Sequence, residues 1–227
     1  MPEVVTERRS ISPGRRSATA GGPGRCYRDA MDILLRRPAR LDEWEHRPLW
    51  PAIADGPGPR DHRDVYEAEV AREPPGPPLS RGPFRAVADA ILAYRIFPSS
   101  FVTGVLRRSP VELGDTVGIR YHLPLGVDLF FAARVVARFD GADGPRWRTG
   151  FTYQTLVGHP ELGEETFAVE KSVDDGRISA SLRSWSRPGT WLAKLGAPVV
   201  RRLQVGASRA ALRNLRQIAQ AADGAMR

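Results

Sequence analysis

His159 is the side chain whose type and position best suit acid–base chemistry. It lies between Gly158 and Pro160, and a proline restricts the preceding residue to extended backbone angles. Three glutamates follow it closely in the chain, namely Glu161, Glu164 and Glu165. A histidine beside carboxylates can act as a general base that an acid orients. Two alternatives stay open: a ligand contact, or a hairpin loop whose histidine hydrogen-bonds to the backbone while its glutamates face solvent.

Arg187 is a second candidate, because it precedes Pro188 at the expected start of the last helix. Proline suits the first turn of a helix, and Ser186 is a suitable cap. An arginine there can hold an anionic ligand with help from the helix N-terminus. The alternative is an ion pair with a glutamate of the 161–165 loop.

Several polar-tipped side chains are expected to reach into a mainly apolar cavity and to orient a ligand there. They are Tyr94, Tyr121, Tyr153, Trp185 and Gln204. The alternative for each of them is ordinary core packing with a satisfied polar atom.

Positive charge is concentrated at the C-terminus. The chain has a formal net charge of +8, and residues 186–227 contain eight basic residues but one acid, Asp223. On a helix, four arginines fall within a sector of ~60°: Arg202, Arg209, Arg213 and Arg216. This stripe is either a solvated face or a surface for an acidic protein or another anionic partner. The lack of interleaved aromatic residues argues against nucleic acid.

Other classes of site are excluded or disfavoured. The single cysteine, Cys26, rules out a disulfide framework and a cysteine-built zinc site, and the four histidines are scattered. There is neither a glycine-rich phosphate loop nor a GxSxG motif. We therefore predict no metal and no cofactor. No apolar run is long enough to cross a membrane, no secretory signal is evident, and a cytoplasmic location is expected.

The composition divides the chain into four parts. Residues 1–25 are polar and glycine-rich, and we predict that they are disordered. Residues 26–61 form an arm and linker, and Trp44 and Trp50 indicate that this arm packs on its own domain or on a partner. Residues 62–222 form the domain, and residues 223–227 form a tail.

Hydrophobic periodicity predicts the elements of the domain. Residues 64–71 alternate as a strand, and residues 82–95 carry an apolar face with helical spacing. Period-two alternation then predicts six strands, which begin near Phe101, Val117, Val127, Phe151, Phe167 and Ile178. Helical spacing returns from Pro188 to about residue 222, with a kink near Pro198.

This order predicts an α+β fold in which a curved antiparallel sheet of about seven strands grips one long C-terminal helix. By element order, this is the helix-grip arrangement of Bet v 1 and START-like proteins.

Three segments resemble the domain-of-unknown-function family nineteen-ninety (DUF1990). They are AYRIFP at 93–98, FTYQTLVGHPELGEE at 151–165 and SWSRP at 184–188, the last followed by Pro198 and residues 201–204. The resemblance covers roughly residues 64–220 and implies no established reaction. Gln154 stands where the family usually has glycine, so we count it among the ligand-binding residues and expect the pocket to differ there.

Three functions follow as hypotheses. The first is binding of an apolar or amphipathic small molecule between the sheet and the C-terminal helix. The second is metal-independent cyclisation, dehydration or isomerisation in a biosynthetic pathway, with His159 as acid and base. The third is a protein-interaction module that uses the basic helix and the arm containing Trp44 and Trp50.

Overall fold

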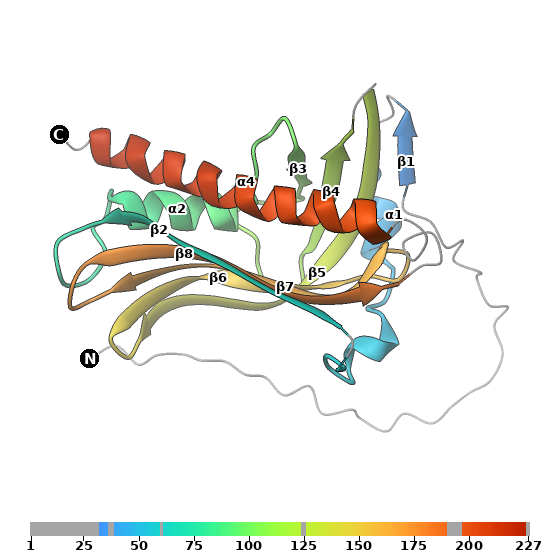
Figure 1. Cartoon of the computed structure of the whole chain (residues 1–227), viewed down its shortest axis with the longest axis horizontal. Helices are drawn as coiled ribbons and strands as arrows, with labels where there is room; N and C mark the ends of the chain where they lie inside the picture. Colours follow the sequence, from blue (N-terminus) through green and yellow to red (C-terminus); the bar gives the residue numbers. More distant parts are fainter. Residues whose placement is uncertain (1–31, 36–38, 60, 124–125, 190–196, 226–227) are drawn as a thin grey trace, which may run out of the picture.

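The computed structural model describes residues 32–35, 39–59, 61–123, 126–189 and 197–225. It shows an antiparallel sheet whose concave face holds two helices (Figure 1). The longer of them, α4 (Ala197–Gly224), runs lengthwise beside β2 and β8 and passes in front of β3 and β4. The predicted fold class, a curved antiparallel sheet gripping a C-terminal helix, is therefore confirmed. The predicted disorder of residues 1–25 lies outside the described residues.

The described residues form one sheet of eight strands, seven of which follow the order β2-β8-β7-β6-β5-β4-β3. Their bounds are β2 His62–Arg72, β3 Val102–Val105, β4 Thr116–His122, β5 Val127–Asp143, β6 Arg146–Thr155, β7 Glu161–Ser172 and β8 Arg177–Pro188. All neighbours in this order are antiparallel. The eighth strand, β1 (Asp32–Leu35), pairs with the first residues of β5.

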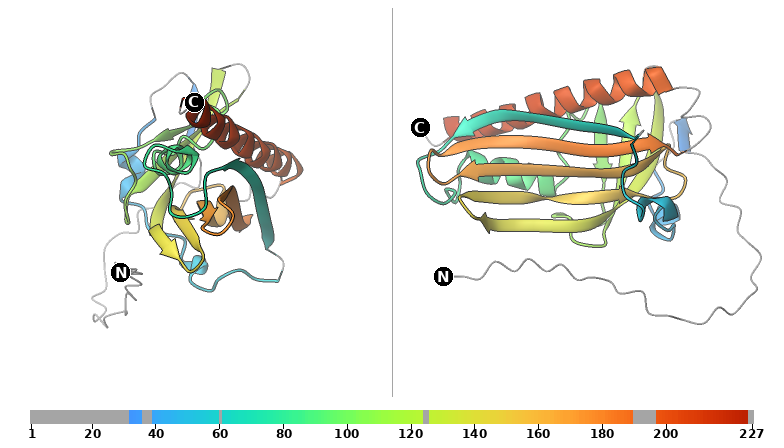
Figure 2. Two further views of the ribbon diagram at one scale, coloured as in Figure 1. Left: turned by 90° about the vertical axis from the view of Figure 1, so that its left-hand side faces the viewer. Right: turned by 60° about the horizontal axis from the view of Figure 1, so that its bottom comes forward.

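Strand β5 produces the curvature of the sheet, because its two halves have different partners. Its first half pairs with β4 and its second half with β6. The register shifts between Val135 and Ala137, and a bulge of this kind bends a strand and increases its twist. As a result, β3 and β4 rise beside α4, while β6, β7 and β8 run beneath it (Figures 1 and 2).

Two helices cover the concave face. Helix α2 (Pro83–Leu92) starts at a proline and buries Phe84, Val87, Ala88 and Ile91 against the sheet, as its spacing predicts. Helix α4 buries Ala207, Ala211, Leu215 and Ala219 at intervals of four residues. It packs against α2 and β2. Small alanines let the helix approach its neighbours closely.

A buried ion pair holds the start of α2 against the sheet. Lys171 Nζ lies 3.0 Å from Glu73 Oε2, and both side chains are fully buried. Glu73 also accepts hydrogen bonds from the backbone N–H groups of Phe84 (2.9 Å) and Leu79 (3.1 Å). Lys171 in turn donates to the Pro77 carbonyl at 3.0 Å. Glu73 therefore serves as a remote cap for α2, at the helix end that attracts negative charge.

The N-terminal arm packs on its own domain. It contains two short helices, α1 (Asp42–Glu45) and the 3-10 helix η1 (Pro51–Ile53). Trp44 is fully buried, with its ring edge-on to Phe130 at a centroid distance of 6.3 Å. The backbone N–H of Trp50 donates to the Thr155 carbonyl. Trp44 is thus part of the core, which corrects its proposed use as a partner-binding residue. The division of the chain at residue 62 stays a prediction.

The predicted start of the last helix is wrong. Pro188 ends β8, and α4 begins at Ala197. The period-two alternation of β8 continues through Ser186 and Arg187, which pair with Gly163 and Leu162 of β7. Pairing with β7 therefore outweighs the local signal of a serine and a proline that would suit a helix start.

Candidate functional site

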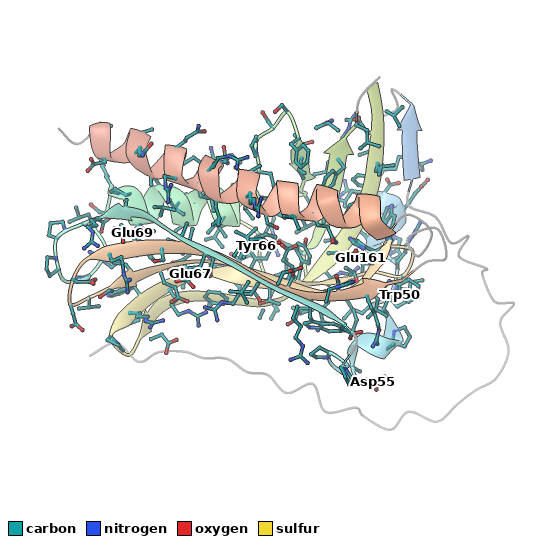
Figure 3. The ribbon with its side chains drawn as sticks, in the orientation of Figure 1. Trp50, Asp55, Tyr66, Glu67, Glu69 and Glu161 are labelled. Carbon is teal, nitrogen blue, oxygen red and sulfur yellow. The ribbon has the colours of Figure 1, made fainter. Side chains whose placement is uncertain are left out.

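A cavity of about 210 Å³ lies between the sheet and α4. Its walls come from strands β2 to β8, from α4, and from the chain that follows α2. Aromatic side chains form much of the lining: Tyr66, Tyr94, Phe97, Tyr121, Phe131 and Tyr153. Figure 3 shows Tyr66 and Glu161 between α4 and the strands, whereas Asp55 lies below the strands, away from α4.

Glu165 places a carboxyl group in this cavity. It is paired in register with Tyr153 of β6, and the Tyr153 hydroxyl donates to its Oε2 at 2.7 Å. Burial raises the pKa of Glu165 to about 7, and the negative charges of Glu161 and Asp64 add to this rise, although the hydrogen bond from Tyr153 opposes it. Glu165 therefore exchanges a proton near neutral pH.

Tyr94 extends this polar group. It follows α2 with a φ of 52°, a left-handed conformation that is rare outside glycine. Its ring fills the space above Gly104, where a Cβ would lie 2.6 Å from Tyr94 Cδ1. Tyr94 also hydrogen-bonds to Tyr153, and burial raises the pKa of both hydroxyls well above the usual value. Both tyrosines are therefore neutral hydrogen-bonding groups at physiological pH.

His159 lies at the edge of the cavity, with its ring edge-on to Phe131 at 4.4 Å. Its Nδ1 is 2.7 Å from the Glu161 carbonyl oxygen and 3.0 Å from the Glu161 backbone nitrogen. Burial lowers the pKa of His159 to about 3, so the imidazole is neutral at physiological pH. The predicted role of His159 as general acid and base stays a prediction.

The structure brings together some of the predicted ligand-binding residues and separates others. Tyr94, Tyr121, Tyr153 and Gln204 border the cavity, and Trp185 borders it from a strand position whose side chain is on the other face of the sheet. Trp185 pairs in register with Glu164, and Glu164 with Gln154, so these three side chains share the face of the sheet opposite Glu165. Gln154 donates to Glu164 Oε2 at 2.8 Å and is not among the residues that line the cavity.

Arg187 also lies away from the cavity lining. It belongs to β8, and its guanidinium group lies 3.3 Å from Asp61 Oδ2 and donates to the Ala52 carbonyl at 3.0 Å. It therefore ties the N-terminal arm to the sheet, in place of the anion clamp or the glutamate pair that the sequence suggested.

At least one arginine of the basic stripe on α4 already has a hydrogen-bond partner within the domain. Arg209 and Arg213 are exposed, while Arg216 donates to the Glu69 carbonyl at 2.8 Å and thereby fastens the helix to β2. The side chain of Arg202 lies outside the described residues. The use of this stripe for an anionic partner stays a prediction.

A hollow of about 240 Å³ lies on another part of the surface, between the arm and the start of β4. Its arginines already have partners. Arg107 pairs with Glu45 at 2.8 Å, Arg108 pairs with Asp115 at 2.8 Å, and Arg134 donates to the Glu45 carbonyl at 2.7 Å. The contacts of Arg107 and Arg134 with Glu45 join the arm to the domain, so we regard this hollow as a structural junction.

A second polar group joins β3, β4 and β5 on the opposite face from the cavity. His122 Nδ1 lies 2.9 Å from Asp128 Oδ1, and its Nε2 lies 3.1 Å from Thr103 Oγ1. Arg120 donates to the same aspartate at 2.6 Å. Because the arginine neutralises Asp128, we interpret this group as a link between strands.

Sequence reasoning named Glu165 only as a neighbour of His159 and missed Asp64 and Tyr66. The sequence signal that identifies Glu165 is its position in the alternating pattern of β7. Glu165, Phe167 and Val169 alternate in β7, and the latter two are buried in the core. An acid in phase with core residues indicates an inward carboxyl group.

Two observations bear on metals and membranes. Within the described ranges, no three His, Cys, Asp or Glu side chains come together so that they could hold a metal ion. The helices in the described part of the chain are too short or too polar to span a bilayer. The predicted cytoplasmic location stays a prediction.

Comparison with known proteins identifies the family. Residues 52–214 match the family model of the domain of unknown function DUF1990. The chain belongs to this family. A UPF0548 protein of Dictyostelium discoideum is 32% identical to this DUF1990 chain over 129 residues. The match covers 53% of this chain and 59% of the relative's length.

Solved structures similar to this DUF1990 domain share little sequence with it. A hypothetical protein of Helicobacter pylori is 12% identical, with a TM-score of 0.47, over 75% of this chain and 94% of that one. Norcoclaurine synthase of Thalictrum flavum, solved with dopamine and hydroxybenzaldehyde, is 9% identical, with a TM-score of 0.40, over 70% and 86%. A major latex-like protein of Panax ginseng is 9% identical, with a TM-score of 0.39, over 69% and 96%.

Proposed function

We propose that this DUF1990 domain binds an apolar or amphipathic small molecule in the cavity between the sheet and α4. The observation that carries the proposal is the cavity of about 210 Å³, whose walls are mainly aromatic and aliphatic and include a few polar groups. Ligand sites are typically apolar hollows in which a few placed polar groups fix orientation. Burial of the ligand's apolar surface would supply most of the binding free energy.

Filling the cavity tests this proposal. Ala207 lies on α4, is 3% exposed and lines the cavity, so Ala207→Phe would place a phenyl ring in the space that a ligand needs. Gln217→Phe adds the same ring at an exposed position of α4 and is the matched control. Native mass spectrometry of freshly purified protein would detect a retained small molecule, and titration with the dye 1-anilinonaphthalene-8-sulfonate would measure binding.

We expect the wild type and Gln217→Phe to bind the dye, and Ala207→Phe to bind it at least tenfold more weakly while it keeps the circular dichroism spectrum of the wild type. Equal dye affinity in all three folded proteins, with no small molecule retained by the wild type, would contradict the proposal.

Proton-transfer catalysis in the same cavity is the second candidate, and the environment of Glu165 favours it. A carboxyl group whose pKa is about 7 can both accept and return a proton at neutral pH. In such a reaction the Glu165 carboxylate would take a proton from carbon and deliver it to another atom of the same substrate, as isomerisation requires.

Cyclohexanone is a small neutral probe for this activity, because removal and return of its α-proton in D₂O leaves deuterium on the carbon. We expect the wild type to accelerate this exchange, more strongly as the pH rises through about 7. His159→Gln should keep the acceleration and Glu165→Gln should lose it. Equal exchange rates with wild type and Glu165→Gln would rule out this use of Glu165.

A further inference from the structure

Three tyrosine hydroxyls and one carboxyl group border the cavity on side chains from different parts of the fold. Tyr94 follows α2, Tyr121 belongs to β4, and Tyr153 and Glu165 are paired in register on β6 and β7. Apolar side chains line much of the remaining wall, among them Phe97, Val102, Ile119, Leu129 and Phe131. A ligand that fills this space must either pair with the polar atoms or leave them unpaired, which costs free energy.

Two of the hydroxyl protons are already used within this group. Tyr153 donates to Glu165 Oε2 at 2.7 Å, and a hydroxyl has only one proton to give. The hydrogen bond between Tyr94 and Tyr153 is therefore donated by Tyr94 to the Tyr153 oxygen. The order of donation runs from Tyr94 to Tyr153 to Glu165, and it ends on one oxygen of the carboxyl group.

Two polar atoms of the group remain for a ligand. Within the described ranges, neither Glu165 Oε1 nor the Tyr121 hydroxyl has a hydrogen-bond partner. Both atoms border accessible space, because the fully buried side-chain atoms without a partner in the described part of the chain are Trp50 Nε1 and Arg138 Nε. Burial raises the pKa of Tyr121, and the negative charge of Glu165 adds to the rise. The Tyr121 hydroxyl therefore keeps its proton and lies close enough to Glu165 for that charge to act on it.

A hydroxyl group on the ligand suits a free donor beside a free acceptor, because one oxygen can both accept and donate. Its oxygen would accept from Tyr121, and its proton would go to Glu165 Oε1. A ketone can only accept, so it would leave the carboxylate oxygen unpaired, and a hydrocarbon would leave both atoms unpaired. A buried polar atom that is left unpaired costs more free energy than a formed hydrogen bond contributes.

We propose that the ligand of this cavity carries a hydroxyl group on an apolar body, and that this hydroxyl accepts from Tyr121 and donates to Glu165 while the body packs against the apolar wall. This inference rests on the proposed function, because it requires that the cavity bind a small molecule. It adds the polar group that the molecule presents and the two residues that select it.

Three probes of matched shape test the inference: 1-indanol, 1-indanone and indane, which carry a hydroxyl, a carbonyl oxygen and no oxygen on the same ring system. Isothermal titration calorimetry at pH 8 would measure each affinity for the full chain, and displacement of 1-anilinonaphthalene-8-sulfonate would show that each probe occupies the cavity. The variants are Tyr121→Phe and Glu165→Gln. Glu67→Gln is the matched control, because Glu67 is half-exposed and pairs with Arg183 at 3.6 Å outside the cavity.

We expect the wild type and Glu67→Gln to bind the alcohol about tenfold more tightly than the hydrocarbon, and the ketone less tightly than the alcohol. Tyr121→Phe should reduce the preference for the alcohol over the hydrocarbon severalfold. Glu165→Gln should reverse the preference between alcohol and ketone, because its amide oxygen can accept from Tyr153 while its N–H donor takes the place of Oε1. The hydrocarbon should bind all four proteins equally, since each variant keeps the apolar wall.

Two results would overturn the inference, and they differ in what they leave standing. If the hydrocarbon displaces the dye from the wild type and the alcohol binds no more tightly, the hydroxyl preference fails and the binding function stands. If no probe binds and Ala207→Phe binds the dye as the wild type does, both proposals fail.

Discussion

The hydroxyl of Tyr153 and the carboxyl group of Glu165 form a hydrogen bond of 2.7 Å across β6 and β7, on the face of the sheet that α4 covers. The two residues are directly opposite in the ladder, so the register of the sheet fixes the contact. The bond directs Glu165 into the cavity and stabilises its charged form. Burial and the nearby Glu161 and Asp64 act in the other direction. The protonation state of Glu165 therefore responds to small changes near neutral pH.

Glu165→Gln should change how stability depends on pH. The pKa of Glu165 is raised to about 7 in the folded state from an ordinary 4.5, so between these values the folded state holds more protons and the wild type loses stability as pH rises. The loss is on the order of 3 kcal/mol when complete. The titratable groups that interact with Glu165 are Tyr94, Tyr121, Tyr153, Glu161 and Asp64. Urea unfolding from pH 5 to pH 8 should therefore show that the stability of Glu165→Gln increases relative to that of the wild type as pH rises.

Tyr153→Phe is the companion variant. It removes the hydrogen bond that lowers the pKa of Glu165, so the loss of stability should continue to a higher pH than in the wild type. Parallel stability curves for all three proteins would show that Glu165 does not titrate in this range.

His159 should remain neutral at mildly acidic pH. Its folded pKa of about 3 lies below the ordinary 6.5, so the unfolded state binds more protons between these values and stability falls as pH falls. We expect the imidazole C–H resonances of His159, assigned by comparison with His159→Gln, to stay constant from pH 8 to pH 5. That variant should also lose less stability in acid. A titration midpoint near 6.5 would contradict the buried environment.

Breaking the buried ion pair of Lys171 and Glu73 should reduce the free energy of unfolding much more than breaking a surface pair. Lys171→Met leaves a buried carboxylate without its cation, and removal of one partner of such a pair costs about 3–5 kcal/mol. The half-exposed pair of Arg183 and Glu67 is the control, and Arg183→Gln should cost less than about 1 kcal/mol. Urea unfolding measures both changes. Similar small losses would mean that Glu73 is adequately stabilised by its backbone donors.

Substitution by alanine at two glycines should change the stability of the protein in opposite directions. A Cβ at Gly150 of β6 would lie 2.1 Å from the Phe167 carbonyl oxygen, so Gly150→Ala must displace a strand and should cost about 1–3 kcal/mol. Gly206 of α4 is exposed, with nothing near its missing Cβ, so Gly206→Ala should stabilise the protein by about 1 kcal/mol. Thermal melts compare both variants with the wild type. A shift of the same sign in both would contradict the packing at Gly150.

The alternation of apolar residues predicted strands β2 to β8 and the face of α2, because period two and period 3.6 directly reflect which side chains are buried. It did not predict β1, and it placed residues 161–165 in a loop although they begin β7. The start of α4 was misplaced because local capping signals at Ser186 and Pro188 do not reveal that β7 is the partner of this segment. The burial of Trp44 depends on contact with Phe130, far away in sequence. Glu165 was underestimated because its environment depends on Tyr153 of β6 and Asp64 of β2, which are distant in sequence.

The place of Trp44 has a practical consequence. The family match starts at residue 52, yet an indole from residue 44 has no exposed surface and fills the interior beside Phe130. A fragment trimmed to the matched boundary would carry a hole where that ring belongs, at a cost comparable to a tryptophan-to-alanine change, about 3–5 kcal/mol. We therefore expect a fragment that includes Trp44 to be more stable than one that begins at residue 52.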